Sequence, residues 1–391
     1  MRASKLWRHD KDSMVTTLFI VWGKLMKPAV PMGLLAFLLF AGVVNSQTIR
    51  DLPPPPPMAT PKPKPTPTPK PPSEEVLDVV RVTSNLVMVP VAVTDSQGQA
   101  IQGLQIPDFR LLEEGKQQEI AELGDPEQVP LDIALLFDVS SSVSEKGFFE
   151  FQQNAAATFL KEVMKPVDKA AIFTIAAEPT LVQPLASAEA AAAKMRTIPA
   201  ASASVPTAFY DSVAAAAKYL AENSESRHRR VIVVISDGDD NFSERIRALS
   251  IADARATLSG QSAPASALAA LNEKHRRAVM DIQQLVQKAD ATFYSVNPGG
   301  PSVRMNQIST RAQNGMESIA AATGGTAFLP DGQADLQKVF RQVAAELRGQ
   351  YLVMYYAGTD VPAGAFRRID VLLPSKPNLK VRARQGYYRK K

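Results

Sequence analysis

The sequence lacks cysteine and contains little histidine. No cysteine occurs among its 391 residues, which excludes disulfide bonds and thiolate chemistry. The three histidines are His9, His228 and His275, so histidine-based catalysis and zinc ligation are poorly supplied. With 45% hydrophobic and 7% aromatic residues, the chain has enough apolar material for one ordinary core and a smaller second one.

Positive charge is concentrated near the N-terminus. The formal net charge is +5, and residues 1–46 hold six Lys or Arg and two acids, so they contribute +4 and the remainder only +1. A second basic segment, residues 366–391, has nine Lys or Arg against the single acid Asp370. We interpret it as a solvated sheet edge that resists strand-to-strand aggregation, and we expect no nucleic-acid partner.

Residues 1–46 are predicted to be a signal peptide or leader. The segment 31–44, "PMGLLAFLLFAGVV", is apolar and uncharged but shorter than the roughly 20 residues that span a membrane comfortably. Val44 and Ser46 suit a cleavage site before Gln47, and Met26 offers a second translation start. An uncleaved membrane anchor is the alternative, because "MVTTLFIVWG" adds apolar length upstream. Either way we expect the body of the protein outside the cytoplasm, in the periplasm, at the cell surface or secreted.

A proline-rich linker and two β-rich flanks surround a central segment. Residues 47–76 include 12 prolines between positions 53 and 72, and such a segment is typical of a stiff polyproline II spacer. Residues 77–128 show short β-rich runs with turns at "DSQGQ" and "EEGKQ", which predict about four strands. Residues 350–391 return to a β pattern. Neither flank has a full core, so we expect the two to pair into one small β domain.

Between the flanks, residues 130–348 alternate strands and helices. The runs "LDIALLFDV" and "VIVVISDG" are continuously apolar, and "AAIFTIAA" and "ATFYSV" are shorter runs of the same kind. Such runs are typical of strands that are covered on both faces. Helices are expected around residues 147–164, 187–196, 208–222, 266–289 and 333–348. The predicted fold class is α/β, with a doubly wound, mostly parallel, Rossmann-like sheet flanked by the small β domain.

Acidic and hydroxyl side chains follow the two most apolar strands. The stretch "LLFDVSSSVSEK" contains Asp138, Ser140 and Ser142, and "VIVVISDGDDN" contains Asp237. Thr207 stands before a helix in "SVPTAFYDSV". In a doubly wound sheet, ligands bind at the carboxyl ends of the strands where strand order reverses. If these two strands are neighbours at the reversal, the acids meet there.

Two carboxylates and three hydroxyls form a set of hard oxygen ligands that suits Mg²⁺ or Mn²⁺. Two acids only balance the charge of the cation, so it can still accept an anionic oxygen from a partner. Each residue also has a simpler interpretation. In these simpler interpretations, Asp138 caps the N-terminus of a helix and the serines bond within the same turn. Asp237 and Gly238 then form a plain turn, and Thr207 caps the N-terminus of the next helix.

The three stretches together resemble the metal-ion-dependent adhesion site (MIDAS) of von Willebrand factor type A (VWA) domains. The flanks resemble an exported VWA-related family of acidobacterial type, in "NLVMVPVAVTDSQG", "GLQIPDFRLLEEGKQQEI" and "LKVRARQGYY". The resemblance covers about residues 77–391. It implies that the metal set is Asp138, Ser140, Ser142, Thr207 and Asp237, with the hydroxyls bound directly and at least one acid acting through water.

This sequence departs from the family pattern at two positions. Ser141 replaces the usual glycine of the first motif, and Pro206 replaces a more flexible residue before the threonine. Residues 241–290 are longer than usual, and we expect the excess to form extra helix near the face of the site. In the family, an acid bound to the metal displaces the helix that corresponds to residues 333–348. The resemblance therefore implies coupling to the β domain through Leu347–Gln350.

The function that we expect is a non-enzymatic, exported adhesion module. It would capture a carboxylate of a protein or glycan partner through the cation, and no particular oligomeric state is predicted. An alternative is an assembly partner of a chaperone-type ATPase. Such partners are mostly cytoplasmic, whereas the leader indicates export. A third is a hydrolase with Ser140 as nucleophile or with metal-bound water. The sequence offers that hydrolase no histidine in a strand-end loop and no Gly-x-Ser-x-Gly elbow.

Overall fold

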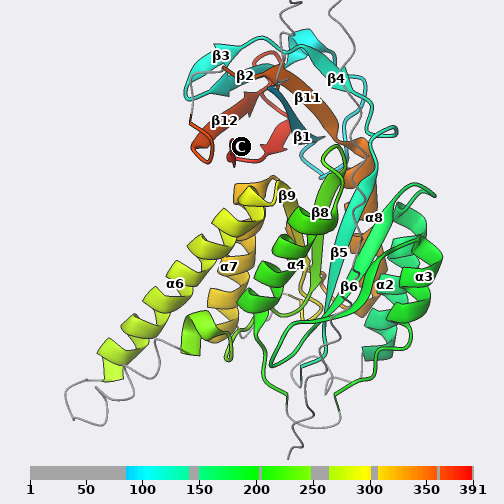
Figure 1. The fold of residues 1–391 in the computed structure, drawn as a ribbon, viewed down its shortest axis with the longest axis vertical. Helices are drawn as coiled ribbons and strands as arrows, with labels where there is room; N and C mark the ends of the chain where they lie inside the picture. The colour runs from blue at the N-terminus through cyan, green and yellow to red at the C-terminus, as the bar shows by residue number, and fades with distance from the viewer. Residues whose placement is uncertain are drawn as a thin grey trace, which may run out of the picture. The chain divides into compact units, whose positions relative to one another are not determined.

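The computed structural model describes residues 85–140, 149–201, 205–247, 264–300, 307–358 and 362–389 (Figure 1). All of them belong to one compact unit, Val79–Lys391. The predicted leader and proline-rich linker lie outside the described residues. Within the described ranges, no helix is both long enough and apolar enough to cross a membrane.

A six-stranded sheet forms the centre of the α/β part, in the order β10-β9-β8-β5-β6-β7. Its strands are β5 (Leu131–Asp138), β6 (Lys169–Ile175), β7 (Thr180–Ala186), β8 (Arg229–Ile235), β9 (Ala291–Val296) and β10 (Ala327–Phe328). All pairs are parallel except β6 with β7. The chain builds outward from β5 through β6 and β7, then returns to place β8 on the other side of β5. The strands that end in the two predicted acids are therefore neighbours at the reversal of strand order, as expected.

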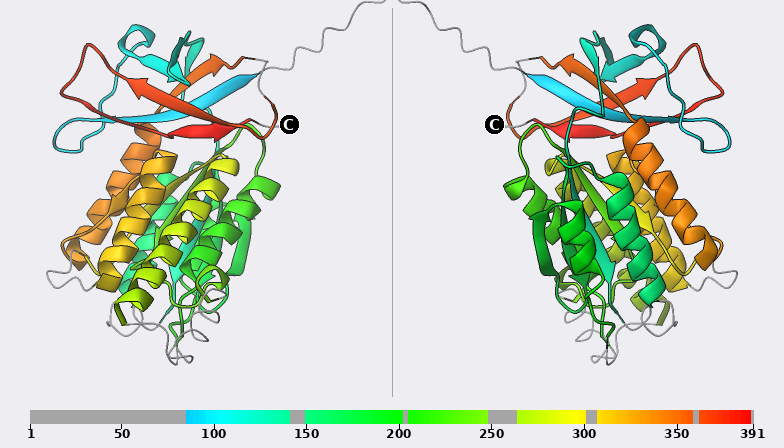
Figure 2. Two further views of the ribbon diagram at one scale, coloured as in Figure 1. Left: turned by 90° about the vertical axis from the view of Figure 1, so that its left-hand side faces the viewer. Right: turned by 90° about the vertical axis from the view of Figure 1, so that its right-hand side faces the viewer.

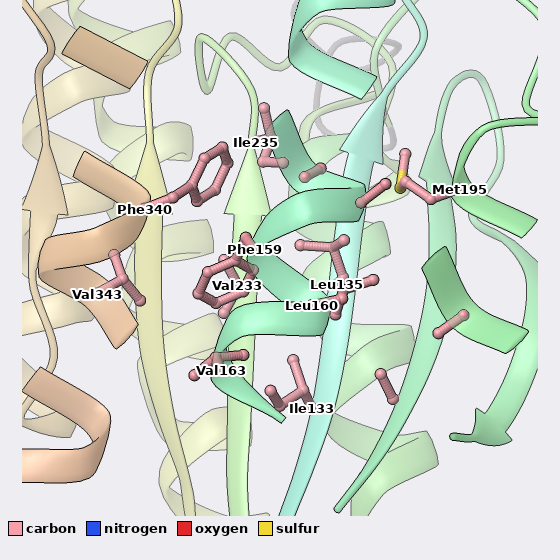
Figure 3. Close-up of a cluster of buried hydrophobic side chains, with 14 of the residues drawn as sticks. Ile133, Leu135, Phe159, Leu160, Val163, Met195, Val233, Ile235, Phe340 and Val343 are labelled. Carbon is pink, nitrogen blue, oxygen red and sulfur yellow. The ribbon is translucent and has the colours of Figure 1, made fainter. Parts of the chain in front are cut away.

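Helices cover both faces of this sheet, as the doubly wound prediction requires (Figure 1). One face carries α2 (Phe149–Val163), α3 (Ala188–Met195) and α8 (Gln333–Gly349); the other carries α4 (Phe209–Asn223), α6 (Pro264–Lys288) and α7 (Gln307–Thr323). Alternate residues of β5 enter the two cores, with Ile133 and Leu135 in one and Ala134 and Leu136 in the other. Figure 3 shows Phe159 of α2 over the first of these cores.

The two β-rich flanks pair with each other in two antiparallel four-stranded sheets. The first contains, in order, β13 (Lys380–Ala383), β1 (Leu86–Thr94), β11 (Tyr351–Tyr356) and β4 (Glu122–Gly124). The second contains β14 (Gly386–Tyr388), β12 (Phe366–Leu372), β2 (Arg110–Glu113) and β3 (Lys116–Gln118). Each sheet takes two strands from each flank, so the expected pairing is confirmed. Figure 2 shows α8 leading directly into β11.

Three elements of the α/β part have no counterpart in the expectations from sequence: helix α7, strand β7 and the two-residue strand β10. Helix α7 buries mostly small side chains, and Met316 and Ile319 are the two large apolar residues of its buried face. Such a face produces a weak hydrophobic pattern. Strand β7 is an edge strand with no fully buried residue, and it contains Pro184; edge strands are one of the few places in a sheet where proline is tolerated.

The first residue of β8 is a buried arginine. Arg229 is 6% exposed, and burial lowers the pKa of its guanidinium. Its Nη1 donates to Leu347 O at 2.9 Å and to Gln350 Oε1 at 3.3 Å, and its Nη2 donates to Pro126 O at 3.2 Å. The cation thus caps the C-terminus of α8, where a positive charge is favourable.

The basic C-terminal strands are not simply solvated edges. Arg382 bonds to Glu346 of α8 at 2.5 Å, and Arg384 pairs with Asp290 just before β9. The backbone of Gln385 also donates to Ala322 O at 3.1 Å. Strands β13 and β14 are sheet edges, as expected. Arg382 and Arg384 nevertheless join the antiparallel sheets to the α/β part, which corrects the expectation that this edge is only solvated.

Deleting residues 351–391 should unfold the N-terminal flank. The deletion leaves β1 and β4 without any paired strand, because β1 pairs with β11 and β13 and β4 pairs with β11. Limited proteolysis should then cut residues 85–124 in the truncated protein but not in the full chain. Equal protection of this flank in both proteins would contradict the role of the pairing.

Arg229→Leu should lower the free energy of unfolding by about 2–4 kcal/mol, because it leaves buried carbonyl groups without a donor. Urea denaturation followed by circular dichroism measures the change. Arg227→Leu is the control, since Arg227 is exposed two residues earlier. A loss of less than about 0.5 kcal/mol, the range of ordinary surface substitutions, would show that Arg229 is not a structural anchor.

Candidate metal site

Asp138, the last residue of β5, carries a fully buried carboxylate. Its Oδ1 accepts the backbone N–H of Ser140 at 2.8 Å, and its Oδ2 accepts Ser236 Oγ at 2.5 Å. Burial, and then the negative charge of Asp237, raise the pKa of Asp138 to about 6, although these hydrogen bonds act in the opposite direction. The ionised carboxylate is thus short of positive charge, and a cation at this point would stabilise it.

Asp237 stands in the loop that leaves β8. Ser236 joins this loop to β5, because Gly238 N donates to Ser236 Oγ at 2.9 Å. Gly238 has φ of +76°, a conformation that strains any residue with a side chain, and a Cβ there would lie 2.7 Å from Met316 Cε. The Oδ1 of Asp237 accepts Asp239 N at 3.3 Å, so the simpler turn interpretation holds beside the metal interpretation. No hydrogen bond from a described residue reaches its Oδ2.

Thr207 is 3% exposed and directly precedes α4. The N-cap of α4 is Ala208, and no side chain caps the helix there, so the N-cap interpretation of Thr207 is wrong. The backbone of Thr207 is held instead by the loop after β8. Its N–H donates to Asn241 Oδ1 at 2.9 Å, and its carbonyl accepts the N–H groups of Asn241 and Phe242, both at 3.1 Å. The Thr207 hydroxyl makes no hydrogen bond to any described residue.

The structure brings four of the five predicted residues to one edge of the sheet, at the carboxyl ends of β5 and β8. They are Asp138, Ser140, Thr207 and Asp237. Ser142 lies outside the described residues. Asp138 ends a strand and does not begin a helix, so its N-cap interpretation is wrong, although the bond from Ser140 N forms the expected local turn.

This set of donors fits a hard divalent cation. All the side-chain ligands are oxygens, and one carboxylate is buried with a raised pKa. Among the described residues, no group of three or more His, Cys, Asp and Glu is arranged to hold a metal ion. Metal binding by these residues stays a prediction.

Asp240 is a further buried residue of this edge, which the sequence did not distinguish from its acidic neighbours. It is 3% exposed. Its Oδ2 accepts Tyr210 N at 2.8 Å and Ser243 Oγ at 2.5 Å, and its Oδ1 accepts Ser243 N at 3.0 Å and Phe242 N at 3.2 Å. Burial raises the pKa of Asp240. With both oxygens engaged in hydrogen bonds, Asp240 orders the start of α4 and is a poor candidate for a ligand.

Helix α6 packs against α4 and α7 and corresponds to the helix expected around residues 266–289. Residues 248–263, in which much of the expected extra length falls, lie outside the described residues. The buried His275 of α6 places Nδ1 3.1 Å from the Tyr210 hydroxyl. Arg311 of α7 donates to Asn272 of α6 at 3.3 Å. Burial, followed by the charges of Arg311 and Lys274, lowers the pKa of His275 to about 4.

Comparison with protein families identifies the central segment. Residues 133–239 match the family described as the von Willebrand factor type A domain. This match runs from β5 to the loop after β8, so it includes the strand reversal and the predicted acids. This segment is therefore similar to von Willebrand factor type A domains, and it has the α/β fold with a mostly parallel sheet that this similarity implies. No curated protein matches the chain.

Several solved structures resemble the chain at low sequence identity. A von Willebrand factor type A protein from Catenulispora acidiphila is 13% identical, with 79% of this chain and 64% of that chain covered and a TM-score of 0.40. The corresponding domain of a type V pilus tip protein from Porphyromonas gingivalis is 13% identical, with 55% and 94% covered and a TM-score of 0.38.

Proximal thread matrix protein 1 from the mussel byssus, with a zinc-occupied MIDAS motif, is also 13% identical to this chain. The alignment covers 61% of this chain and 50% of the mussel protein, with a TM-score of 0.39. The chain thus spans half of the length of that protein. At this identity none of these structures transfers a ligand or a partner to the chain.

His275 should make the protein sensitive to mild acid. The unfolded chain takes up a proton near the ordinary pKa of 6.5, whereas folded His275 does so near 4. The contribution of His275 to stability is therefore complete above pH 6.5 and is lost as the pH falls toward 4. We expect His275→Gln to reduce the loss of stability between pH 7 and 4.5 by about 1–2 kcal/mol, as measured by urea denaturation. Parallel stability curves for the two proteins would rule out this assignment.

Proposed function

We propose that this chain is an exported, non-enzymatic binding module that holds a carboxylate of a protein or glycan partner through Mg²⁺ or Mn²⁺. The observation that carries the proposal is the buried Asp138 carboxylate, beside Asp237, at the strand reversal of a segment similar to von Willebrand factor type A domains. The proposed finer classification is the exported VWA-related family of acidobacterial type, on the basis of the flanking motifs.

Each predicted residue has a role in holding the cation. Asp138 and Asp237 supply negative charge, and Ser140, Ser142 and Thr207 supply neutral oxygens. When bound, the cation provides a Lewis acid that accepts an anionic oxygen of the partner. With two acids in the set, its charge is only balanced, which favours an acidic partner over a neutral one.

The export proposal rests on the leader. The apolar segment 31–44 and the cleavage pattern before Gln47 support secretion or anchoring at the cell envelope. The proline-rich residues 53–72 would then serve as a spacer between the envelope and the domain. The same leader disfavours assembly with a cytoplasmic chaperone-type ATPase.

The proposal also assigns no catalytic role to the two described histidines, which are engaged elsewhere. His228 lies at the start of β8, at the opposite end of that strand from Asp237, with Nδ1 3.0 Å from Asp132 Oδ2. His275 is buried on α6 against Tyr210. A serine nucleophile needs a base within hydrogen-bond reach, and neither contact supports that role for these histidines.

Asp138→Asn tests the proposal. In the wild type, millimolar Mg²⁺ or Mn²⁺ should raise the melting temperature by about 2–4 °C for each kcal/mol of binding free energy. The amide can accept Ser140 N–H and donate to Ser236 Oγ, so the variant should fold and melt no lower than the metal-free wild type. Its response to the cation should be lost, because the charge that holds the cation is gone. Differential scanning calorimetry with and without chelator measures both effects.

Asp168→Asn is the matched control for this experiment. Asp168 is also buried and accepts two backbone N–H groups, from Leu131 at 2.8 Å and Lys165 at 2.7 Å. It precedes β6, at the opposite end of the sheet from Asp138, so its variant should keep the response to the cation. A wild type whose melting curve is the same across millimolar Mg²⁺ and Mn²⁺ would contradict the proposed function.

A further inference from the structure

The loop after β8 holds Thr207 through three backbone-directed hydrogen bonds. Asn241 supplies two of them, since its Oδ1 accepts Thr207 N–H at 2.9 Å and its own N–H donates to Thr207 O at 3.1 Å. Phe242 N–H gives the third, also to Thr207 O. Both polar backbone groups of Thr207 are therefore satisfied by this one loop, which leaves its side chain as the only group free to face a ligand.

The same loop fixes the helix that Thr207 precedes. Asp240 accepts Tyr210 N–H, and Ser243 Oγ accepts Asp211 N–H at 3.1 Å. These two N–H groups belong to the first turn of α4 and have no partner inside the helix. On the other side, Ala208 N donates to Ala176 O, just after β6, at 2.8 Å. The backbone around Thr207 is thus held on one side by the loop after β8 and on the other by Ala176, just after β6.

Asp237 begins this loop, four residues before Asn241. The next residue, Gly238, has a left-handed backbone that favours glycine, and its N–H donates to Ser236 Oγ. The loop therefore joins one predicted ligand, Asp237, to another, Thr207, which is 30 positions earlier in the sequence. Asn241 is the residue whose side chain makes this connection.

We infer that Asn241 is a positioning residue of the metal site. By fixing the backbone of Thr207, it makes Thr207 and Asp237 one preformed part of the site, beside Asp138 at the end of β5. This inference rests on the proposed function. Asn241 does not contact the cation, yet its loss should weaken metal binding, because removing outer groups that orient metal ligands typically reduces affinity 10- to 100-fold.

The test compares Asn241→Leu with Asn241→Asp in the full chain, with Mn²⁺ alone as the probe. Leucine is close in size to asparagine but cannot accept the Thr207 N–H, whereas aspartate can. Isothermal titration should show Mn²⁺ binding about 10- to 100-fold weaker in Asn241→Leu. The affinity of Asn241→Asp should equal or exceed that of the wild type. Asn241→Ala, which removes the acceptor and adds no bulk, repeats the test if the leucine variant does not fold.

A control separates positioning from general stability. Thr323 is buried, and its Oγ1 accepts the backbone N–H of Phe293 at 3.1 Å, at the start of β9. Thr323→Val removes a similar acceptor far along the sheet from Thr207. It should lower the melting temperature while leaving the Mn²⁺ affinity unchanged.

Hydrogen exchange provides a readout that needs no metal. In the metal-free protein, the Thr207 amide should exchange at least about tenfold faster in Asn241→Leu than in the wild type, and Asn241→Asp should restore the protection. If the wild type and Asn241→Leu bind Mn²⁺ with equal affinity, this inference is overturned and the proposed function survives. If the wild type does not bind Mn²⁺, both are overturned.

Discussion

A carboxylate buried where two parallel strands end side by side is the constraint on which this site depends. Removing a charge from water costs several kcal/mol unless nearby groups compensate for it. Ser140 N–H and Ser236 Oγ–H compensate Asp138 in part, and Ser236 also ties the loop of Asp237 to β5. The bonds that satisfy Asp138 thus bring a second negative charge next to it, which raises its pKa further. The fold keeps an excess of negative charge at this edge, and a cation would relieve it.

The opposite end of β8 is held by buried positive charge. Arg229 caps the carbonyl of Leu347 and bonds to Gln350, which in turn donates to the Tyr294 hydroxyl at 3.1 Å. Glu346, one residue earlier in α8, accepts the Tyr294 hydroxyl at 3.0 Å and pairs with Arg382. A shift of α8 relative to β8 and β9 would break or rearrange these contacts. Movement at the joint between α8 and β11 therefore costs free energy, because it disturbs hydrogen bonds and ion pairs of both the α/β part and the antiparallel sheets.

Sequence patterns predicted the features that depend on local order. The apolar runs of β5 and β8 and the polar residues behind them were sufficient for the strand reversal and for placing Asp138 and Asp237 at one edge. These patterns were insufficient where contacts between distant parts of the chain determine whether a helix forms or what a residue does. Helix α7 uses small residues against α6, and Arg229 looks like a turn residue until its carbonyl partners are known. Asn241 is 34 positions from Thr207, so no local pattern connects them.

The choice of residues in the loop after β8 is consistent with an open cation site. This loop contains three carboxylates, yet Asp240 uses both oxygens to order α4 and the loop itself. Burial, and then Asp237, raise the pKa of Asp239, so further negative charge is already disfavoured there. An asparagine at position 241 accepts the Thr207 N–H without adding a fourth charge. Under the proposed function, this neutrality matters, because each extra carboxylate near the cation would reduce its attraction for the acid of a partner. The loop therefore fixes Thr207 with an amide and leaves the charge of the cation to be completed from outside.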